Sequence, residues 1–256
     1  MIKKVRQIVR TSKDYDFLKE NDKLGEHIEL LVVGGSYAYG TNTAGSDIDL
    51  RGFALNTKRE ILTNKDFGHV KDNQTDTIIY SFNKFITMLT KCNINCIELL
   101  GCKKENYLHI GVIGRLLLDN ADIFLSQKIT YIIEGYVKNE LKKVREYKKI
   151  QSTNQEKLCK SMMHIIRLYA MGYNILRDGK ITTFRKNDHD LLMDLRNGVY
   201  INYKGEILPE FYDVLSIYKK KFNYVKNNTV LPLHEDVERI EYLTMCVNEK
   251  IVLGRL

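Results

Sequence analysis

Two aspartates separated by one apolar residue, Asp47 and Asp49, are the side chains best suited to chemistry. An apolar residue also follows Asp49, so the segment alternates like a strand, and residues two apart on a strand face the same side. Two neighbouring carboxylates repel each other unless a cation lies between them. Mg²⁺ takes few carboxylates together with the oxygens of substrate phosphates. The pair therefore predicts a magnesium site that acts on a phosphate ester.

A glycine turn that precedes the aspartates supplies a place for the phosphate. The apolar, β-branched run 28–33 is typical of a strand and ends at Gly34 and Gly35. Glycine allows the backbone to approach a ligand closely. Ser36 offers a hydroxyl and an N–H at an expected helix start, which suits an anion. A phosphate-binding turn beside paired aspartates indicates metal-assisted phosphoryl or nucleotidyl transfer.

The succession of an apolar strand, Gly35 and Ser36, a short gap and Asp-x-Asp resembles the signature of the DNA polymerase β nucleotidyltransferase superfamily. The alternative is an Asp-x-Asp on a surface strand beside an unrelated glycine turn. Within this superfamily, the sequence resembles the RlaP or YcgL-like group of RNA-ligase-associated, polymerase-β-like nucleotidyltransferases. Ile94 stands where this family usually has the proline of Asn-Pro-Asn, which loosens a turn without touching the metal ligands. Matching pieces cover most of the chain in order, at residues 34–40, 46–52, 80–85, 93–100, 160–168 and 195–198.

The resemblance implies a third carboxylate on a strand next to the Asp pair. Asp76 is the candidate, because it lies at the start of the expected strand 75–81. A carboxylate there is suited to accept the proton of the attacking hydroxyl. Asp72 is the second choice, and Asp66 and Glu98 stay open. The alternative for Asp76 is an ordinary solvated residue at a strand start.

Three basic side chains of the second half, Lys160, His164 and Arg167, line one face of an expected helix. A cationic stripe on an apolar helix is costly when it faces the core without partners. The resemblance implies that it faces a nucleotide opposite the Asp pair, with Lys160 and Arg167 on the β- and γ-phosphates. Arg196 is a further candidate. The alternatives are a solvated polar edge, a structural role for His164, and for Arg51 a structural ion pair with a carboxylate.

The expected elements divide the chain into two parts of different character. Strands are expected at 28–33, 47–55 and 75–81, and a helix over 83–100 is interrupted near Asn93. Further helices are expected at 123–149, 156–176, 212–225 and 235–252. The predicted class is α+β. We expect a polymerase-β-like domain over 1–120, with a mixed β-sheet flanked by helices. A helical nucleotide- and substrate-binding domain over 121–256 is expected to follow.

Composition and charge set broad limits on the class of protein. The 256 residues include 44% hydrophobic and 28% charged side chains, which excludes a disordered or collagen-like chain. Forty Lys and Arg against 32 Asp and Glu leave a formal charge of +8, which favours polyanionic partners. The basic runs 138–149 and 219–221 are candidates to follow an RNA backbone, although such runs are often only solvated helix faces.

The sequence also predicts where the protein works. Its first residues lack the apolar core of a signal peptide, and no run of about 18 apolar residues predicts a membrane span. Five cysteines, an odd number, fit reduced thiols in the cytoplasm. A cytoplasmic location is therefore expected, with no membrane and no obligate protein partner.

We therefore predict a nucleotidyltransferase that uses two Mg²⁺ ions, with Mn²⁺ as a substitute, to move an NMP from an NTP to a hydroxyl. Asp47, Asp49 and Asp76 are the predicted catalytic and metal-binding residues. By resemblance, the acceptor is an RNA or tRNA end. The alternatives are nucleotidylylation of a protein side chain or a small molecule, and a non-catalytic nucleotide- or RNA-binding module. The predicted nucleotide-binding residues are Gly35, Ser36, Lys160, His164, Arg167 and Arg196.

Overall fold

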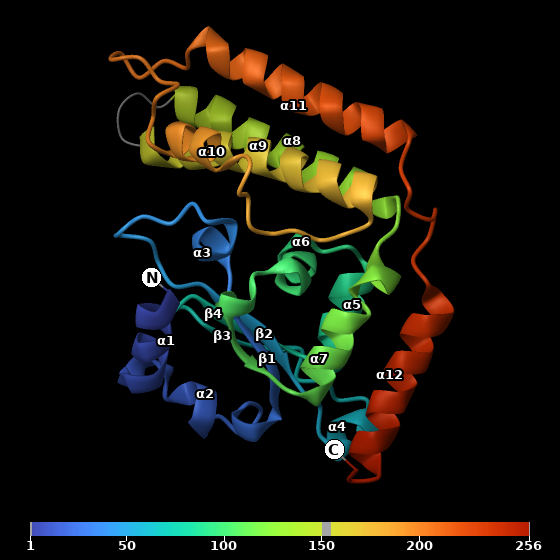
Figure 1. The fold of residues 1–256 in the computed structure, drawn as a ribbon. Coiled ribbons are helices and arrows are strands. Elements are labelled where there is room, and N and C mark those ends of the chain that lie inside the picture. The colour runs from blue at the N-terminus through green and yellow to red at the C-terminus, as the bar shows by residue number, and fades with distance from the viewer. Residues whose placement is uncertain (1, 150–154, 256) are drawn as a thin grey trace. The chain divides into compact units, whose positions relative to one another are not determined.

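The computed structural model describes residues 2–149 and 155–255, without the side chains of residues 148 and 149. Contacts divide the chain into two compact units (Figure 1). Unit 1 consists of Met1–Phe124 together with Glu235–Leu256, and unit 2 of Leu125–His234. The predicted second domain, 121–256, differs from this grouping in its last helix, which is counted with unit 1.

Unit 1 is built on a mixed sheet with the strand order β3-β4-β2-β1-β5. β2 and β4 are parallel, whereas the other neighbouring pairs are antiparallel. This mixed sheet with surrounding helices confirms the predicted α+β class. The strands are β1 (Ile28–Val33), β2 (Leu50–Ala54), β3 (His69–Asp72), β4 (Thr77–Ser81) and β5 (Tyr107–Ile110).

Helices cover the sheet of unit 1, and local capping determines where several of them begin. Thr57 forms a capping box with Glu60 at α4, and Ser81 and Asn93 cap α5 and α6. The cap at Asn93 explains the interruption that the sequence predicts in the helix over 83–100. The helices are α1 (Ile2–Thr11), α2 (Phe17–Glu20), α3 (Gly35–Tyr39), α4 (Lys58–Thr63), α5 (Phe82–Thr90), α6 (Ile94–Ile97), α7 (Val112–Asp119) and α12 (Val237–Val252).

The last helix, α12, joins unit 1 through side-chain and packing contacts with early parts of the chain. It packs against α4 and α5. Asn248 donates to the Asn83 side chain at 3.0 Å, and Arg239 donates to the Asn120 side chain at 3.0 Å. The helical pattern of the sequence predicts this helix but does not show which part of the chain it packs against.

Unit 2 is helical and centred on α9. Among the described residues of this unit, three other helices each pack against α9 (Figure 1). Gly172 of α9 allows side chains of α11 and α8 to pack closely against α9. A Cβ at this position would lie 2.7 Å from the Phe222 ring and 3.3 Å from Ile133. The helices are α8 (Lys128–Lys149), α9 (Gln155–Asp178), α10 (His189–Arg196) and α11 (Pro209–Asn227).

The strand predicted over 47–55 is shorter than expected at its start. Pairing of β1 with β2 ends at the Val33–Leu50 pair, because the chain turns at Gly34. Asp47 and Asp49 therefore precede the strand, and the prediction that they lie on one strand face is wrong. The sequence reading also missed β3 and β5, which are four residues each. None of the described helices is long and apolar enough to cross a bilayer.

Gly52 in the middle of β2 gives a test of this core. A Cβ at Gly52 would overlap the backbone carbonyl of Leu30 on β1. Because backbone cannot swing aside as a side chain can, we expect Gly52→Ala to lower the free energy of unfolding by about 1–3 kcal/mol. Gly45→Ala is the matched control, since nothing lies within 4 Å of its Cβ position. Urea unfolding of both variants measures the difference, and equal stability of the two would contradict the packing described.

Candidate active site

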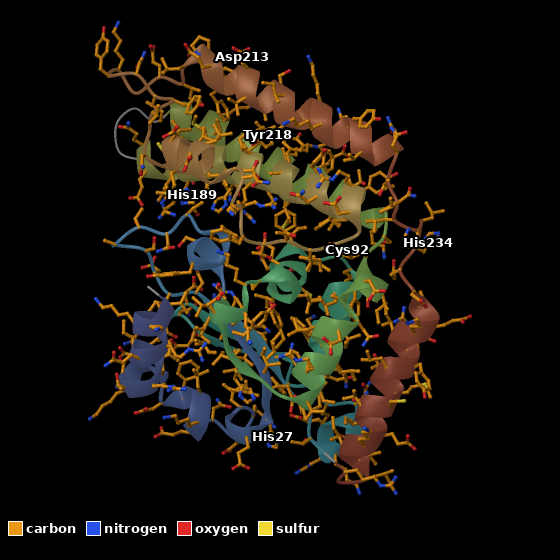
Figure 2. All side chains as sticks on the ribbon, in the orientation of Figure 1. His27, Cys92, His189, Asp213, Tyr218 and His234 are labelled. Atoms are coloured by element: carbon orange, nitrogen blue, oxygen red, sulfur yellow. The ribbon has the colours of Figure 1, made fainter. Side chains whose placement is uncertain are left out.

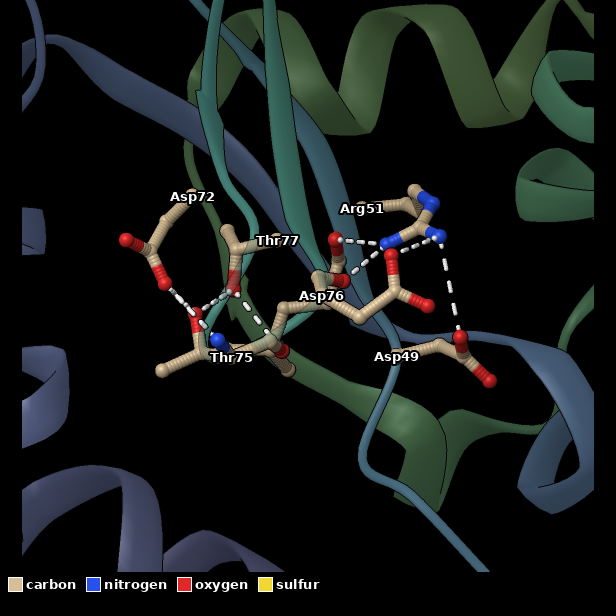
Figure 3. Close-up of polar contacts among 7 residues, drawn as sticks. Asp49, Arg51, Asp72, Thr75, Asp76 and Thr77 are labelled. Atoms are coloured by element: carbon tan, nitrogen blue, oxygen red, sulfur yellow. Dashed lines mark hydrogen bonds and ion pairs between the residues drawn. The ribbon is translucent and has the colours of Figure 1, made fainter.

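Two carboxylates meet at one end of the parallel strand pair. Leu50 pairs with Thr77 in the β2–β4 register, so the preceding residues, Asp49 and Asp76, lie next to each other (Figure 3). Asp76 has a left-handed backbone, with φ of 44°, immediately before β4. The sheet therefore brings together two residues that are far apart in the sequence.

Arg51 links these two carboxylates. Its Nη2 lies 2.9 Å from Asp76 Oδ1 and 3.6 Å from Asp49 Oδ1 (Figure 3). Its Nη1 donates to the backbone carbonyls of Asp76 and of Leu50, the latter at 2.8 Å. The guanidinium thus offsets the repulsion between the acids and holds them at the sheet end. The structural ion pair considered for Arg51 is confirmed.

The two acids also share a hydrogen bond, with opposite effects on their pKa values. Burial, followed by the hydrogen bond with Asp76, raises the pKa of Asp49 to about 7 despite the neighbouring Arg51. The same hydrogen bond, supported by Arg51, lowers the pKa of Asp76. The pair therefore behaves as one site that shares a proton, with Asp49 holding it and Asp76 ionised.

The glycine turn is built directly against Asp49. Gly34 N donates to the Asp49 carbonyl at 2.8 Å. Gly35 has φ of +52°, and a Cβ there would overlap Asp49 Oδ2, so only glycine fits. Ser36 follows as a half-buried residue in the first turn of α3. The sequence-predicted Gly35, Ser36 and Asp49 are thus brought together.

Asp47 lies at the margin of this group. It is exposed, in the irregular segment before β2, and its charge contributes to the raised pKa of Asp49. In the described part of the chain, no three His, Cys, Asp or Glu side chains already converge as a metal-binding group. The structure therefore pairs Asp49 with Asp76 and leaves Asp47 beside them.

The other candidates for the third carboxylate have partners of their own. Asp72 accepts from the backbone N and the hydroxyl of Thr75, at 2.7 and 2.8 Å (Figure 3). Asp66 accepts from the Asn56 side chain at 3.0 Å. Glu98 is buried and accepts from the Tyr39 hydroxyl at 2.8 Å. Asp76 is the candidate that the fold puts next to Asp49.

The predicted cations of the second half gather in unit 2. Arg167 is buried, and its Nε donates to His164 Nδ1 at 3.4 Å. Lys160 pairs with Glu156 at 3.0 Å. Burial first, and then the surrounding cations, lower the pKa of His164 to about 3, so its ring is neutral at physiological pH. Sequence reasoning did not associate Lys143 of α8 with this group, because the contact crosses helices. The cations acting on His164 are Arg167, Lys143, Arg196 and Lys160.

A mixed sheet that sets paired aspartates against a Gly-Ser turn defines a polymerase-β-like nucleotidyltransferase domain. Over residues 7–200 the chain matches the family described as "RlaP: RNA repair pathway DNA polymerase beta family". The protein belongs to this family, which confirms the resemblance found in its motifs, and the family description implies polymerase-β-like nucleotidyltransferase activity in an RNA repair pathway. Comparison with curated proteins and with solved structures gave no match.

The shared proton predicts an unusual pH dependence of stability. The folded protein keeps a proton on Asp49 up to a pKa of about 7, whereas an unperturbed aspartate releases it near 3.8. Raising the pH between these values therefore removes stability. We expect Asp49→Asn to flatten this loss and to raise the free energy of unfolding at pH 8 by about 1–2 kcal/mol.

Denaturant unfolding at a series of pH values measures this effect. Asp213→Asn is the control, an exposed carboxylate near the start of α11 (Figure 2). The control should keep the slope of the unsubstituted protein. An unchanged slope in Asp49→Asn would contradict the shared proton.

Proposed function

We propose that this protein is a Mg²⁺-dependent nucleotidyltransferase that moves an NMP from an NTP to a hydroxyl at an RNA or tRNA end. The observation that carries the proposal is the Asp49–Asp76 pair beside Asp47, built against Gly35. The description of the family supports RNA repair as the setting. A cytoplasmic location, and action without an obligate protein partner, are part of the proposal.

The chemistry of the donor set fits divalent metal ions. Three carboxylates, Asp47, Asp49 and Asp76, interact at one end of the sheet, and oxygen ligands of this kind suit Mg²⁺ and Mn²⁺. These residues would hold two ions. Bound there, the ions supply charge neutralisation and polarisation of the phosphates.

The protein groups around the pair have separate roles in the proposal. Asp76 is kept ionised by Asp49 and Arg51, so it is able to accept the proton of the attacking hydroxyl. Arg51 orients both carboxylates. Gly35 gives the triphosphate close access to the backbone, and Ser36 adds a hydroxyl and an N–H. Positioning and charge are the main catalytic terms in such a displacement.

The cation group of unit 2 is proposed to bind the β- and γ-phosphates. Lys160 and Arg167 are its main members and Arg196 contributes charge. His164 is neutral and accepts from Arg167, so in this proposal it positions that guanidinium. The cost of burying Arg167 is better offset when an anion is present.

Incubation with labelled NTPs, Mg²⁺ or Mn²⁺, and several acceptors tests the activity. Transfer of label to RNA supports the proposal. Label that goes only to protein, or only to a small molecule such as an aminoglycoside, would replace the RNA acceptor by one of the alternatives. NTP binding without any transfer would favour the non-catalytic module.

The double variant Asp47→Asn with Asp49→Asn tests the carboxylates directly. Removing both charges weakens metal binding and transition-state charge neutralisation, so we expect nucleotide transfer to fall at least about a hundredfold. Single-turnover assays with saturating NTP measure the rate. Asp66→Asn serves as a control carboxylate that bonds elsewhere in unit 1. Unchanged turnover in the double variant would defeat the proposed function.

The phosphate-binding role of unit 2 has its own test. Arg167→Lys keeps the charge but loses the planar fork, and Lys160→Ala removes a charge. We expect the KM for NTP to rise about tenfold in each, with a smaller change in kcat. Lys157→Ala, an exposed lysine on the same helix, is the matched control. A KM that matches the control in both variants would remove this group from the site.

A further inference from the structure

Unit 2 carries a groove that the proposed transfer reaction does not use. α8 and α11 both pack against α9, and between them lies a cavity of about 320 Å³. Tyr169 of α9, which is buried, forms part of its wall. The groove is therefore a formed feature of the helical packing. Its lining includes Lys138, Leu141, Arg145, Tyr169, Lys219 and Asn223.

The groove concentrates cations from two helices. Lys138 and Arg145 are seven residues apart on α8 and share a helix face, while Lys219 approaches from α11. All three are exposed, and none has a carboxylate partner within 4 Å among the side chains that the structure describes. Most basic runs are only solvated helix faces, but here three such cations border a single cavity.

Neighbouring lysines differ in this respect, because carboxylates already compensate them. Lys142 pairs with Glu146 at 3.8 Å, and Lys143 pairs with Glu140 at 2.6 Å. In the second basic run, Lys221 lies over the Tyr218 ring at 5.4 Å. Among the cations of the two basic runs whose side chains the structure describes, Lys138, Arg145 and Lys219 line the groove. Lys148 and Lys149 lie outside the described side chains.

One residue of the groove lining, Glu134, is acidic, and its charge is paired. Lys226 Nζ donates to Glu134 Oε1 at 2.8 Å in an ion pair, and Lys226 also lies over the Tyr131 ring at 5.6 Å. Beyond this bridge lies a second cavity of about 390 Å³, whose lining includes Tyr131 and His234. Tyr131 is 70% exposed, so one ring in this cavity remains largely open to solvent.

We propose that this groove, together with the second cavity, binds a single strand of RNA, with its phosphates on Lys138, Arg145 and Lys219 of the groove and a base stacked on Tyr131 of the second cavity. Tyr131 and Arg145 are separated by about 21 Å along α8, so the surface has room for several nucleotides. Cations that follow the backbone, combined with an exposed aromatic ring, are the general means of binding single strands. A duplex would keep its bases stacked away from Tyr131. The choice of RNA rests on the proposed function.

Binding of a fluorescein-labelled single-stranded RNA of about twelve nucleotides to the full-length protein tests this proposal. The groove variant combines Lys138→Gln, Arg145→Gln and Lys219→Gln. We expect its Kd to rise at least about tenfold, and the slope of log Kd against log salt to become shallower by about 2, since three phosphate contacts are lost.

The matched control removes the same number of charges from unit 2 outside the groove. It combines Lys157→Gln, Lys180→Gln and Lys204→Gln, which are exposed and do not line either cavity. We expect its Kd to stay within about threefold of the unsubstituted protein. Equal weakening of the groove and control variants would overturn the proposal, because it would mean that net charge alone determines binding.

Variants of Tyr131 distinguish the contribution of base stacking from that of charge. We expect Tyr131→Ala to raise the Kd about tenfold with little change in salt slope, while Tyr131→Phe keeps the affinity because its ring still stacks. An unchanged Kd in Tyr131→Ala, or tighter binding of duplex RNA with the same loss in the groove variant, would overturn the single-strand assignment.

These binding measurements are independent of catalysis. The Asp47→Asn, Asp49→Asn protein should bind the same RNA as well as the unsubstituted protein. Groove-dependent RNA binding without nucleotide transfer would defeat only the proposed function. Transfer to RNA with full affinity in the groove variant would defeat only the groove.

Discussion

The repulsion between two carboxylates at the end of one pair of strands is the constraint on which the candidate site depends. Asp49 and Asp76 lie side by side because β2 and β4 are parallel and in register. The ion pairs with Arg51 and one shared proton offset their repulsion. Such a pair is costly for stability in itself, since burial disfavours charge. Proteins tolerate such a local loss of stability mainly at functional sites, and a bound cation would relieve the repulsion between these two carboxylates.

The rest of unit 1 is arranged around that point. The glycine at position 35 is required because the carboxylate of Asp49 occupies the space of a Cβ. The left-handed backbone at Asp76 ends the turn that leads into β4. Thr75 and Asp72 hold that turn by two hydrogen bonds. Local strain and close approach therefore occur where the side chains of the proposed function lie.

The cations of unit 2 lie in two different environments. Around His164, burial in the helical packing, and then the nearby cations, lower the pKa of the imidazole ring. On the α8–α11 side, cations stay exposed around a groove, next to an open tyrosine ring. The first arrangement suits a compact, highly charged ligand and the second a longer polyanion. If both surfaces bind as proposed, part of the +8 charge of the chain faces two separate ligands.

The sequence by itself determined the family, the α+β class and the strand that ends at Gly34, because these depend on local pattern and on motif order. It also singled out Asp49 and Asp76, but only the register of β2 and β4 made them neighbours. The exact start of β2, the short strands β3 and β5, and the place of α12 with unit 1 were decided by tertiary structure. Strand pairing and helix packing join residues that are far apart in the chain, and local sequence patterns carry no information about such contacts.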